Sequence, residues 1–144
     1  MSEPLVCDTS GLLAALDRAD PDHEACVAVV ERHPGPLLIS PLVLAELDHL
    51  LRARLGTEVA RAVADDVAAG AYTLAALSAD DVAACVGLDR QYADLGLGLA
   101  DASLVVLAAR VGTRTLLTLD ERHLRAVRPL QGGSFTLVPA DASD

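Results

Sequence analysis

The fold class is decided by residues 5–13, Leu5-Val6-Cys7-Asp8-Thr9-Ser10-Gly11-Leu12-Leu13. Three apolar residues lead into an aspartate, and the leucines that follow Gly11 recur at helical spacing. This pattern predicts a short buried strand, a tight turn, and a helix with Ser10 as its N-cap. The same order of strand, turn and helix recurs along the rest of the chain, so the prediction extends beyond this segment.

Short apolar runs alternate with segments of helical periodicity through the rest of the sequence. We expect strands at residues 37–39, 72–76, 115–119 and 135–138, and helices at residues 21–33, 41–55, 57–69, 79–95, 100–111 and 121–127. Asp20-Pro21 and Ser40-Pro41 are typical of helix starts, in which the polar residue caps and proline takes the first helical position. The alternation predicts an α/β fold, a three-layer sandwich with a short central parallel sheet covered by helices on both faces. The length predicts one domain, residues 1–144.

The composition excludes several classes of function. The net charge is −10, and all 11 basic residues are arginine, because the chain contains no lysine. No lysine is therefore present to bind phosphates in a Walker A loop, to form a Schiff base or to contact a phosphorylated aspartate. Aromatic residues make up only 2%, too few for a platform on which bases stack. The acidic balance favours a basic partner or a site that binds cations.

The cysteines and the apolar runs bear on the compartment. Cys7, Cys26 and Cys85 are far apart and form no Cys-x-x-Cys pair, which argues against a zinc site and against a disulfide framework. We expect them as small buried side chains in a reducing compartment. No apolar run approaches the roughly 20 residues that span a membrane, and the first residues lack the pattern of a signal peptide. The expected location is therefore the cytoplasm, with no membrane partner.

Four acidic residues stand out from their surroundings. Asp8 and Asp120 each end a predicted strand, and parallel strands end at the same edge of a sheet. Glu46 and Asp101 lie on predicted helices among apolar neighbours, where a solvent-facing carboxylate is not expected. Taken singly, each has a simpler explanation: helix capping for the aspartates, and the edge of an apolar face for Glu46. Together they predict a cluster of carboxylates at the carboxyl end of the sheet.

Such a cluster predicts a metal site. Carboxylates do not converge in a low-dielectric pocket unless a cation is bound or their pKa values rise. A set of oxygen ligands favours Mg²⁺ or Mn²⁺ over zinc. The chain has no Gly-x-Ser-x-Gly motif, and its four histidines show no ligand spacing and are expected at the surface. In the absence of another nucleophile, the cluster indicates attack of water on a phosphodiester.

These residues resemble the motifs of the PIN-domain nucleases, and most closely those of the VapC-type toxins of prokaryotic toxin–antitoxin pairs. The resemblance is carried by Asp8-Thr9-Ser10, Pro41-Leu42-Val43-Leu44-Ala45-Glu46, Leu99-Ala100-Asp101-Ala102 and Thr118-Leu119-Asp120-Glu121-Arg122-His123-Leu124. Each motif is short, but the four occur in order, at matching strand and helix positions, and the resemblance covers the whole chain. The fourth motif often ends in Phe, where this chain has Leu124.

The resemblance implies a PIN-like fold and a Mg²⁺- or Mn²⁺-dependent endoribonuclease, the toxin of a type II toxin–antitoxin pair. Asp8, Glu46 and Asp101 match the core acidic positions of the family, and Asp120 matches a fourth, more variable one. All four are then expected metal ligands in a site where metal-activated water cleaves RNA. Ser10 matches a hydroxyl position that orients the acidic cluster. The resemblance also implies a homodimer and a cognate antitoxin, and the acidic site favours an antitoxin with a basic tail.

Two further features bear on partners. The helix expected at residues 41–55 carries apolar residues on two sides, one of them around Glu46. One side packs on the core in this prediction, and the other lines the site or meets a partner. Arg52 and Arg54 near Glu46, together with Arg18 after the first helix, are candidates for a basic rim that offsets the acidic surface where RNA binds.

Two other interpretations stay open at this point. A haloacid-dehalogenase-like phosphatase also has an aspartate after its first strand, but it needs a second one where this chain has Ser10, and it needs a lysine. The lack of lysine also argues against a receiver domain. A catalytically weak PIN-like binding module would use the acidic groove only to hold a basic peptide, and the presence of all four carboxylates argues against it.

Overall fold

The computed structural model describes residues 2–142, which contain a five-stranded sheet in the order β3-β2-β1-β4-β5. Its strands are β1 (Leu5–Cys7), β2 (Leu37–Ile39), β3 (Thr73–Leu74), β4 (Thr115–Leu117) and β5 (Thr136–Val138). All neighbouring strands are parallel, and Val6 of β1 lies opposite Leu38 of β2 and Leu116 of β4. The carboxyl ends of the strands therefore lie at one edge of the sheet.

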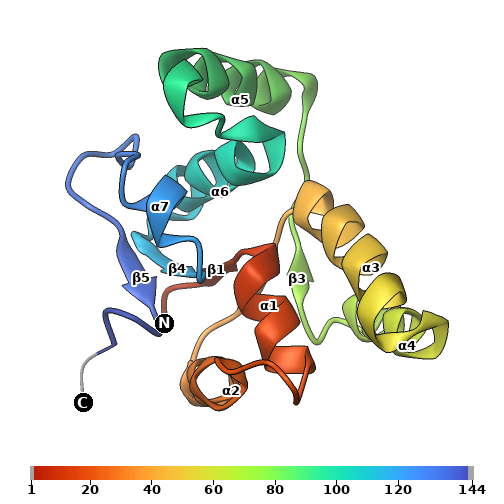
Figure 1. The fold of residues 1–144 in the computed structure, drawn as a ribbon. Coiled ribbons are helices and arrows are strands. Elements are labelled where there is room, and N and C mark those ends of the chain that lie inside the picture. The colour runs from red at the N-terminus through yellow and green to blue at the C-terminus, as the bar shows by residue number, and fades with distance from the viewer. Residues whose placement is uncertain (1, 143–144) are drawn as a thin grey trace.

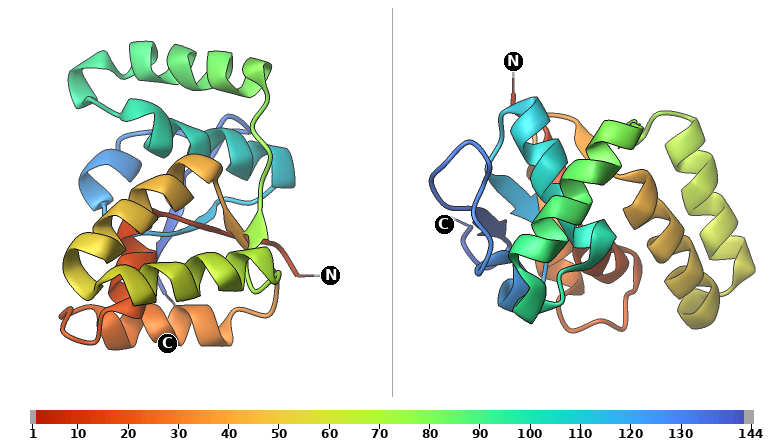
Figure 2. Two further views of the ribbon diagram at one scale, coloured as in Figure 1. Left: turned by 90° about the vertical axis from the view of Figure 1, so that its right-hand side faces the viewer. Right: turned by 90° about the horizontal axis from the view of Figure 1, so that it is seen from above.

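Helices cover both faces of this sheet (Figure 1). They are α1 (Thr9–Leu16), α2 (His23–Arg32), α3 (Pro41–Leu55), α4 (Thr57–Ala68), α5 (Ala79–Gln91), α6 (Gly98–Val111) and α7 (Glu121–Leu124). Helices α1 and α2 pack together on one side, while α6 lies on the other side with α5 outside it (Figure 2). The pair α3 and α4 flanks the β3 side of the molecule. This arrangement confirms the predicted three-layer α/β architecture.

Capping residues explain several helix boundaries. The Ser40 hydroxyl accepts a hydrogen bond from the Leu42 N–H and Pro41 occupies the first turn of α3, as predicted. At α5, the side chain and backbone of Ser78 form a capping box with Asp81. Gly112 ends α6 in the left-handed conformation that glycine adopts at little cost. Each of these residues satisfies backbone groups next to it, so these helix boundaries depend on local sequence.

Gly11 allows α1 to approach β4 closely. A Cβ atom at this position would lie 2.6 Å from the Cγ atom of Leu117, well inside van der Waals contact. Any larger residue would therefore push the first turn of α1 away from β4. The close approach brings the residues at the start of α1 beside those that follow β4.

Three predicted helix starts differ from the structure, at α1, α2 and α6, and α6 begins at Gly98 instead of residue 100. Asp8, not Ser10, is the N-cap of α1, because its side chain accepts a hydrogen bond from the Thr9 N–H. Helix α2 begins at His23, not at residue 21, because the Asp20 side chain accepts from the Asp22 N–H in an Asx turn. Several predicted ends also move. Strand β4 stops at residue 117, α7 stops at residue 124, and α5 ends at residue 91 before a short 3₁₀ helix, η1 (Ala93–Leu95).

The core is built from aliphatic side chains between the layers. Leucine and valine side chains of the strands pack against those of α1, α3 and α6 to form one continuous buried cluster. Cys7, Cys26 and Cys85 are buried and free, as the sequence predicted. Among residues 2–142, no helix is both long and apolar enough to cross a membrane.

Candidate active site

The candidate site lies where the chain order of the sheet reverses. Strands β1 and β4 are neighbours, although β1 is followed along the chain by β2 on its other side. Asp8 directly follows β1, and its backbone N–H donates to the Leu117 carbonyl at 2.8 Å, which extends the pairing by one residue. Thr118 and Asp120 follow β4. Open parallel sheets generally bind ligands at such a point, outside the carboxyl ends of their strands.

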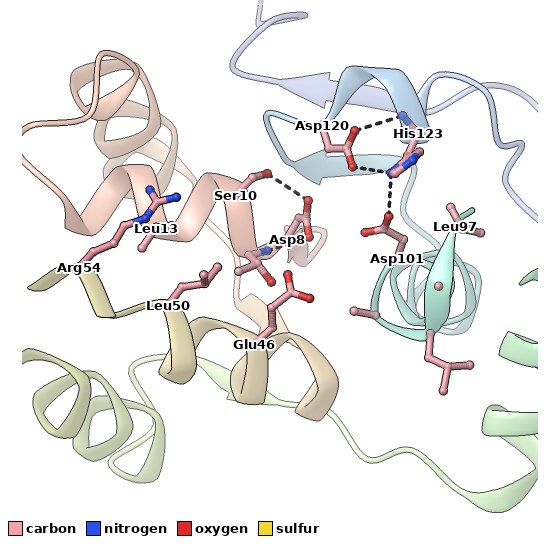
Figure 3. A pocket seen from close by; sticks show the side chains of 14 residues that line it. Asp8, Ser10, Leu13, Glu46, Leu50, Arg54, Leu97, Asp101, Asp120 and His123 are labelled. Carbon is pink, nitrogen blue, oxygen red and sulfur yellow. Dashed lines mark hydrogen bonds and ion pairs between the residues drawn. The ribbon is translucent and has the colours of Figure 1, made fainter. Parts of the chain in front are cut away.

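A pocket of about 410 Å³ opens at this point (Figure 3). Four carboxylates line it, and they are the four acidic residues singled out from the sequence: Asp8, Glu46, Asp101 and Asp120. The other side chains discussed below that line it are Ser10, His123, Arg54, Leu13, Leu50, Leu97 and Leu99. The residues come from both faces of the sheet, because α1 and α3 supply one wall and α6 and α7 supply the other. The pocket therefore combines a charged floor with aliphatic walls.

Asp8 is the most rigidly held of the four carboxylates. It is only 4% exposed, and its Oδ1 accepts a 2.7 Å hydrogen bond from the Thr9 N–H. Its Oδ2 accepts from the Thr118 hydroxyl at 2.7 Å and from the Ser10 hydroxyl at 3.1 Å. Burial raises the pKa of Asp8, while these hydrogen bonds act in the opposite direction. The carboxylate is thus fixed in orientation before any ligand arrives.

The two hydroxyls that hold Asp8 are themselves fixed by the turn after β4. The Ser10 hydroxyl accepts from the Leu119 N–H at 3.0 Å, and the Thr118 hydroxyl accepts from the Asp120 N–H at 3.0 Å. Each hydroxyl therefore donates to Asp8 and accepts from the backbone of the turn. This arrangement joins the start of α1 to the residues that carry Asp120.

Asp120 caps the short helix α7 and is held by a single residue through both of its oxygens. Its Oδ1 accepts from the His123 N–H at 3.1 Å, and its Oδ2 lies 2.8 Å from the His123 Nδ1 atom. The same Nδ1 atom lies 3.2 Å from the Oδ2 atom of Asp101. The His123 ring therefore lies between the carboxylates of Asp101 and Asp120 (Figure 3).

Asp101 shows most clearly that the carboxylates affect one another. It lies in the first turn of α6, and its pKa is raised to about 7. Burial is the largest cause, and the negative charges of Asp8, Asp120 and Glu46 add to it, while His123 acts in the opposite direction. All three other carboxylates are thus close enough to Asp101 to disfavour its charged form. A bound cation would remove this penalty.

Glu46 lines the pocket as expected, but it is more exposed than its apolar neighbours in the sequence suggested. It is exposed on α3, and its carboxylate points into the mouth of the pocket, towards the space beside Asp8 and Asp101. Of the three arginines expected to form a basic rim, Arg54 lines the pocket. Arg52 instead pairs with Asp48 at 2.9 Å, and neither Arg52 nor Arg18 lines the pocket.

A buried pair of hydroxyls connects the helices that carry Glu46 and Asp101. Ser40, the N-cap of α3, shares a 2.8 Å hydrogen bond with Ser103 of α6. Ser103 also contacts the Ala100 carbonyl at 2.6 Å, in the first turn of α6. Both serines are fully buried. The relative position of α3 and α6, and with it the width of the pocket, is set in part by this contact.

The structure brings together all five residues proposed for the site from the sequence, since Ser10 touches Asp8 and the four acidic residues share one pocket. Sequence reasoning missed Thr118 and His123. His123 was expected at the surface, whereas its side chain is 23% exposed and contacts two carboxylates. Its spacing of three residues from the capping Asp120 was the available signal, because such pairs meet in the first turn of a helix. Thr118 carried no comparable signal.

Comparisons with known proteins agree with this geometry. The sequence profile of the family described as "PIN domain" matches residues 5–129. Ribonuclease VapC26 of Mycobacterium tuberculosis is 44% identical over 135 residues, which cover 94% of this chain and 100% of that protein. The crystal structure of VapC20 of Mycobacterium tuberculosis, described as a sarcin–ricin loop cleaving toxin, superposes with a TM-score of 0.75. That match covers 81% of this chain and 89% of VapC20 at 21% sequence identity, so it supports the fold.

Proposed function

The chain belongs to the PIN-domain family, among its VapC-type members, and from this premise we propose that it is a Mg²⁺- or Mn²⁺-dependent endoribonuclease. In this proposal it is the toxin of a type II toxin–antitoxin pair. The observation that carries the proposal is the convergence of Asp8, Glu46, Asp101 and Asp120 in one pocket. The 44% identity to a protein named as a ribonuclease supports the same activity for this chain.

The donor set fits a hard divalent cation. The pocket offers carboxylate oxygens from four residues, and such ligands favour Mg²⁺ or Mn²⁺. The raised pKa of Asp101 also supports a bound cation, because burial and the neighbouring negative charges disfavour the charged form of this carboxylate. We assign Asp8, Asp101 and Asp120 as ligands, directly or through water. Glu46 binds the cation or accepts a proton.

In the proposed hydrolysis, the residues of the pocket have different roles. When bound, Mg²⁺ or Mn²⁺ lowers the pKa of a water molecule and stabilises the charge that develops on the phosphate. The Glu46 side chain makes no hydrogen bond within residues 2–142 and lines the pocket, so its carboxylate is available to accept the proton of the attacking water. Asp8, fixed by Thr118 and Ser10, keeps the ligand geometry constant. Attack by water needs no 2′-hydroxyl, so the products carry no 2′,3′-cyclic phosphate.

RNA binding has to overcome the net charge of −10. Arg54 is the arginine that lines the pocket, and it is placed to contact a phosphate of the substrate strand. Leu13, Leu50, Leu97 and Leu99 supply aliphatic surface for bases or riboses. With so few aromatic residues in the chain, we propose that RNA is selected by backbone shape and by these apolar contacts, not by stacking on aromatic rings.

We also propose a cytoplasmic homodimer that is neutralised by an antitoxin with a basic tail. Helix α3 is the surface we assign to these contacts. Leu47 and Leu51 are buried against the core, whereas Leu50 lines the pocket on another side of the helix. A tail that enters the pocket would meet the four carboxylates. A cation in that tail would offset the cost of burying their charge.

Mapping of cut sites in total RNA tests the proposal. Cells in which the protein is induced should accumulate new RNA ends at a small number of positions. Cells that express Asp8→Asn should not, and Asp66→Asn is the matched control because Asp66 is exposed on α4, outside the pocket. New ends of equal abundance with wild type and Asp8→Asn would contradict the proposal. Binding of a basic peptide without any RNA cleavage would instead favour a non-catalytic binding module.

A further inference from the structure

His123 occupies a position that an all-carboxylate site does not explain. Its Nδ1 atom lies 2.8 Å from Asp120 Oδ2 and 3.2 Å from Asp101 Oδ2. These three residues are partly buried, and each offers one ligand atom within 4.8 Å of the others. The cluster therefore contains a nitrogen donor, although sequence reasoning placed His123 at the surface.

The two separations that involve His123 match those between ligands of one ion. In an octahedral site with bonds of about 2.1 Å, neighbouring ligand atoms lie about 3 Å apart. The two measured separations, 2.8 and 3.2 Å, lie on either side of this value. The third separation, between carboxylate oxygens of Asp101 and Asp120, is within 4.8 Å, so the three side chains are close enough to contact one cation.

The backbone and the ring of His123 favour this arrangement. The His123 N–H donates to Asp120 Oδ1, so the residue is anchored whatever its side chain binds. In the described part of the chain, the Nε2 atom of His123 has no hydrogen-bond partner. The ring proton can therefore reside on Nε2, in contact with solvent, which leaves the lone pair of Nδ1 free for a cation.

We propose that His123 is a nitrogen ligand of the catalytic cation and that it makes the site prefer Mn²⁺ to Mg²⁺. The inference rests on the proposed function, because it concerns the same pocket. Mg²⁺ is a hard ion that binds oxygen and is a poor partner for imidazole, whereas first-row transition ions accept nitrogen donors. The other three residues of the pocket that bear on the cation supply only oxygen from their side chains: Asp8, Glu46 and Ser10. The nitrogen of His123 thus sets the preference between the two ions.

A purely positioning role makes a different prediction. If His123 only orients Asp120 through a hydrogen bond, the bound cation has oxygen ligands alone. Loss of the imidazole would then weaken Mg²⁺ and Mn²⁺ to a similar extent. The nature of the atoms bound to Mn²⁺ therefore separates the two roles directly, without reference to catalytic activity.

Pulsed electron paramagnetic resonance of Mn²⁺ bound to the full-length chain tests the proposal. Wild-type protein should show the hyperfine coupling of a directly bound ¹⁴N, and growth with ¹⁵N-histidine should replace it by the ¹⁵N pattern. The second sample needs no substitution, so it does not depend on whether a variant folds. His123→Gln should lose the coupling, and His49→Gln should keep it, because His49 is exposed on α3 and does not line the pocket.

Competition between the two ions supplies the second readout. Displacement of Mn²⁺ by Mg²⁺, followed through the signal of free Mn²⁺, should show that His123→Gln lowers Mn²⁺ affinity about tenfold or more. Mg²⁺ affinity should change by less than about threefold, because the glutamine carbonyl still offers an oxygen.

Three results would overturn the inference. Bound Mn²⁺ without a nitrogen coupling in the wild-type protein would leave the proposed function intact but reduce His123 to a positioning residue. A coupling that persists in His123→Gln would assign the nitrogen to another residue. A wild-type protein that binds no Mn²⁺ in the pocket would contradict both the inference and the metal-dependent function.

Discussion

The hydroxyl of Thr118 donates a 2.7 Å hydrogen bond to the buried carboxylate of Asp8, across 110 positions of the chain. This bond joins the end of β4 to the end of β1 at the floor of the pocket. The same hydroxyl accepts from the Asp120 N–H, so one side chain sets the position of two of the four carboxylates. The integrity of the candidate site therefore depends on a residue that carries no charge.

We predict that Thr118→Val lowers the rate of RNA cleavage by about 10- to 100-fold, as the loss of an outer hydrogen bond does in metal sites. The side chains have nearly the same shape, so the loss comes from the hydroxyl. Asp8 would keep its burial but lose a donor, and the Asp120 N–H would lose an acceptor. We expect the free energy of unfolding to fall by about 1 to 2 kcal/mol. Urea unfolding and cleavage rates measure the two effects, with Thr136→Val on the exposed part of β5 as control. Wild-type values of both quantities in Thr118→Val would show that the bond does not matter.

The raised pKa of Asp101 makes a prediction for the metal-free protein. Between about pH 4 and pH 7 the folded state holds the Asp101 proton, with its pKa of about 7, while the unfolded state has released it. The unfolded state then binds fewer protons, so this residue lowers the free energy of unfolding as the pH rises.

Asp101→Asn removes this contribution and should be more stable than the wild type at pH 7 by about 1 to 2 kcal/mol, after allowance for solvent screening. The difference should shrink towards pH 4. Urea unfolding in the presence of a chelator, repeated across this range, measures it. A difference that is constant with pH would contradict the assignment of the raised pKa to Asp101. Addition of Mg²⁺ near pH 7 should stabilise the wild type and have little effect on Asp101→Asn.

The four carboxylates could be predicted because each contradicts its surroundings in the sequence. Asp8 and Asp120 directly follow the apolar residues of predicted strands, and Glu46 and Asp101 have apolar neighbours on their predicted helices. The parallel topology then brings the strand ends together at one edge. A charged residue among apolar neighbours can be recognised from a single sequence. It suggests a functional role, because burial of an isolated charge is costly wherever it occurs.

The roles of Thr118 and His123 could not be predicted in the same way. Thr118 lies among leucines in a predicted strand, where threonine is an ordinary residue, and His123 lies in a charged segment, where another polar side chain offers no contrast. The partners of both residues are set by the path of the turn between β4 and α7. The wrong prediction of Ser10 as the N-cap also results from a partner that is distant in the sequence. Either Asp8 or Ser10 can cap a helix, and only the turn after β4 supplies the Leu119 N–H that draws the Ser10 hydroxyl away. The wrong helix start at residue 21 has a local cause. The Asp20 side chain could either cap a helix or form an Asx turn, and in the structure it forms the turn.

We predict that the protein is a homodimer in solution, with α3 at the interface or in the groove that receives the antitoxin. Sedimentation at a concentration of about ten micromolar should give the mass of two chains. Ala45→Arg, a change at an exposed position of α3, should weaken self-association or antitoxin binding without loss of the fold. A monomer at this concentration, together with antitoxin binding that the substitution leaves unchanged, would remove α3 from both surfaces.

We predict that the antitoxin inserts an arginine or lysine beside Asp8, Glu46 and Asp101. An arginine fork pairs two carboxylate oxygens at once and keeps its charge, which suits a cluster that burial would otherwise destabilise. Replacement of that cation by alanine should restore RNA cleavage in a complex that still assembles. If no basic residue of the antitoxin approaches the four carboxylates in a structure of the complex, inhibition must come from blocked access of RNA alone.

The rate of single-stranded RNA cleavage by the purified protein, with Mg²⁺ and with a chelator, tests the central claim most directly. We predict cleavage by the wild type that requires Mg²⁺ or Mn²⁺ and leaves no 2′,3′-cyclic phosphate. Asp8→Asn should be slower by at least about 100-fold with its fold retained, since one ligand is lost and the attacking water is misplaced. Cleavage that proceeds at the same rate in the chelator, or in Asp8→Asn, would contradict the account.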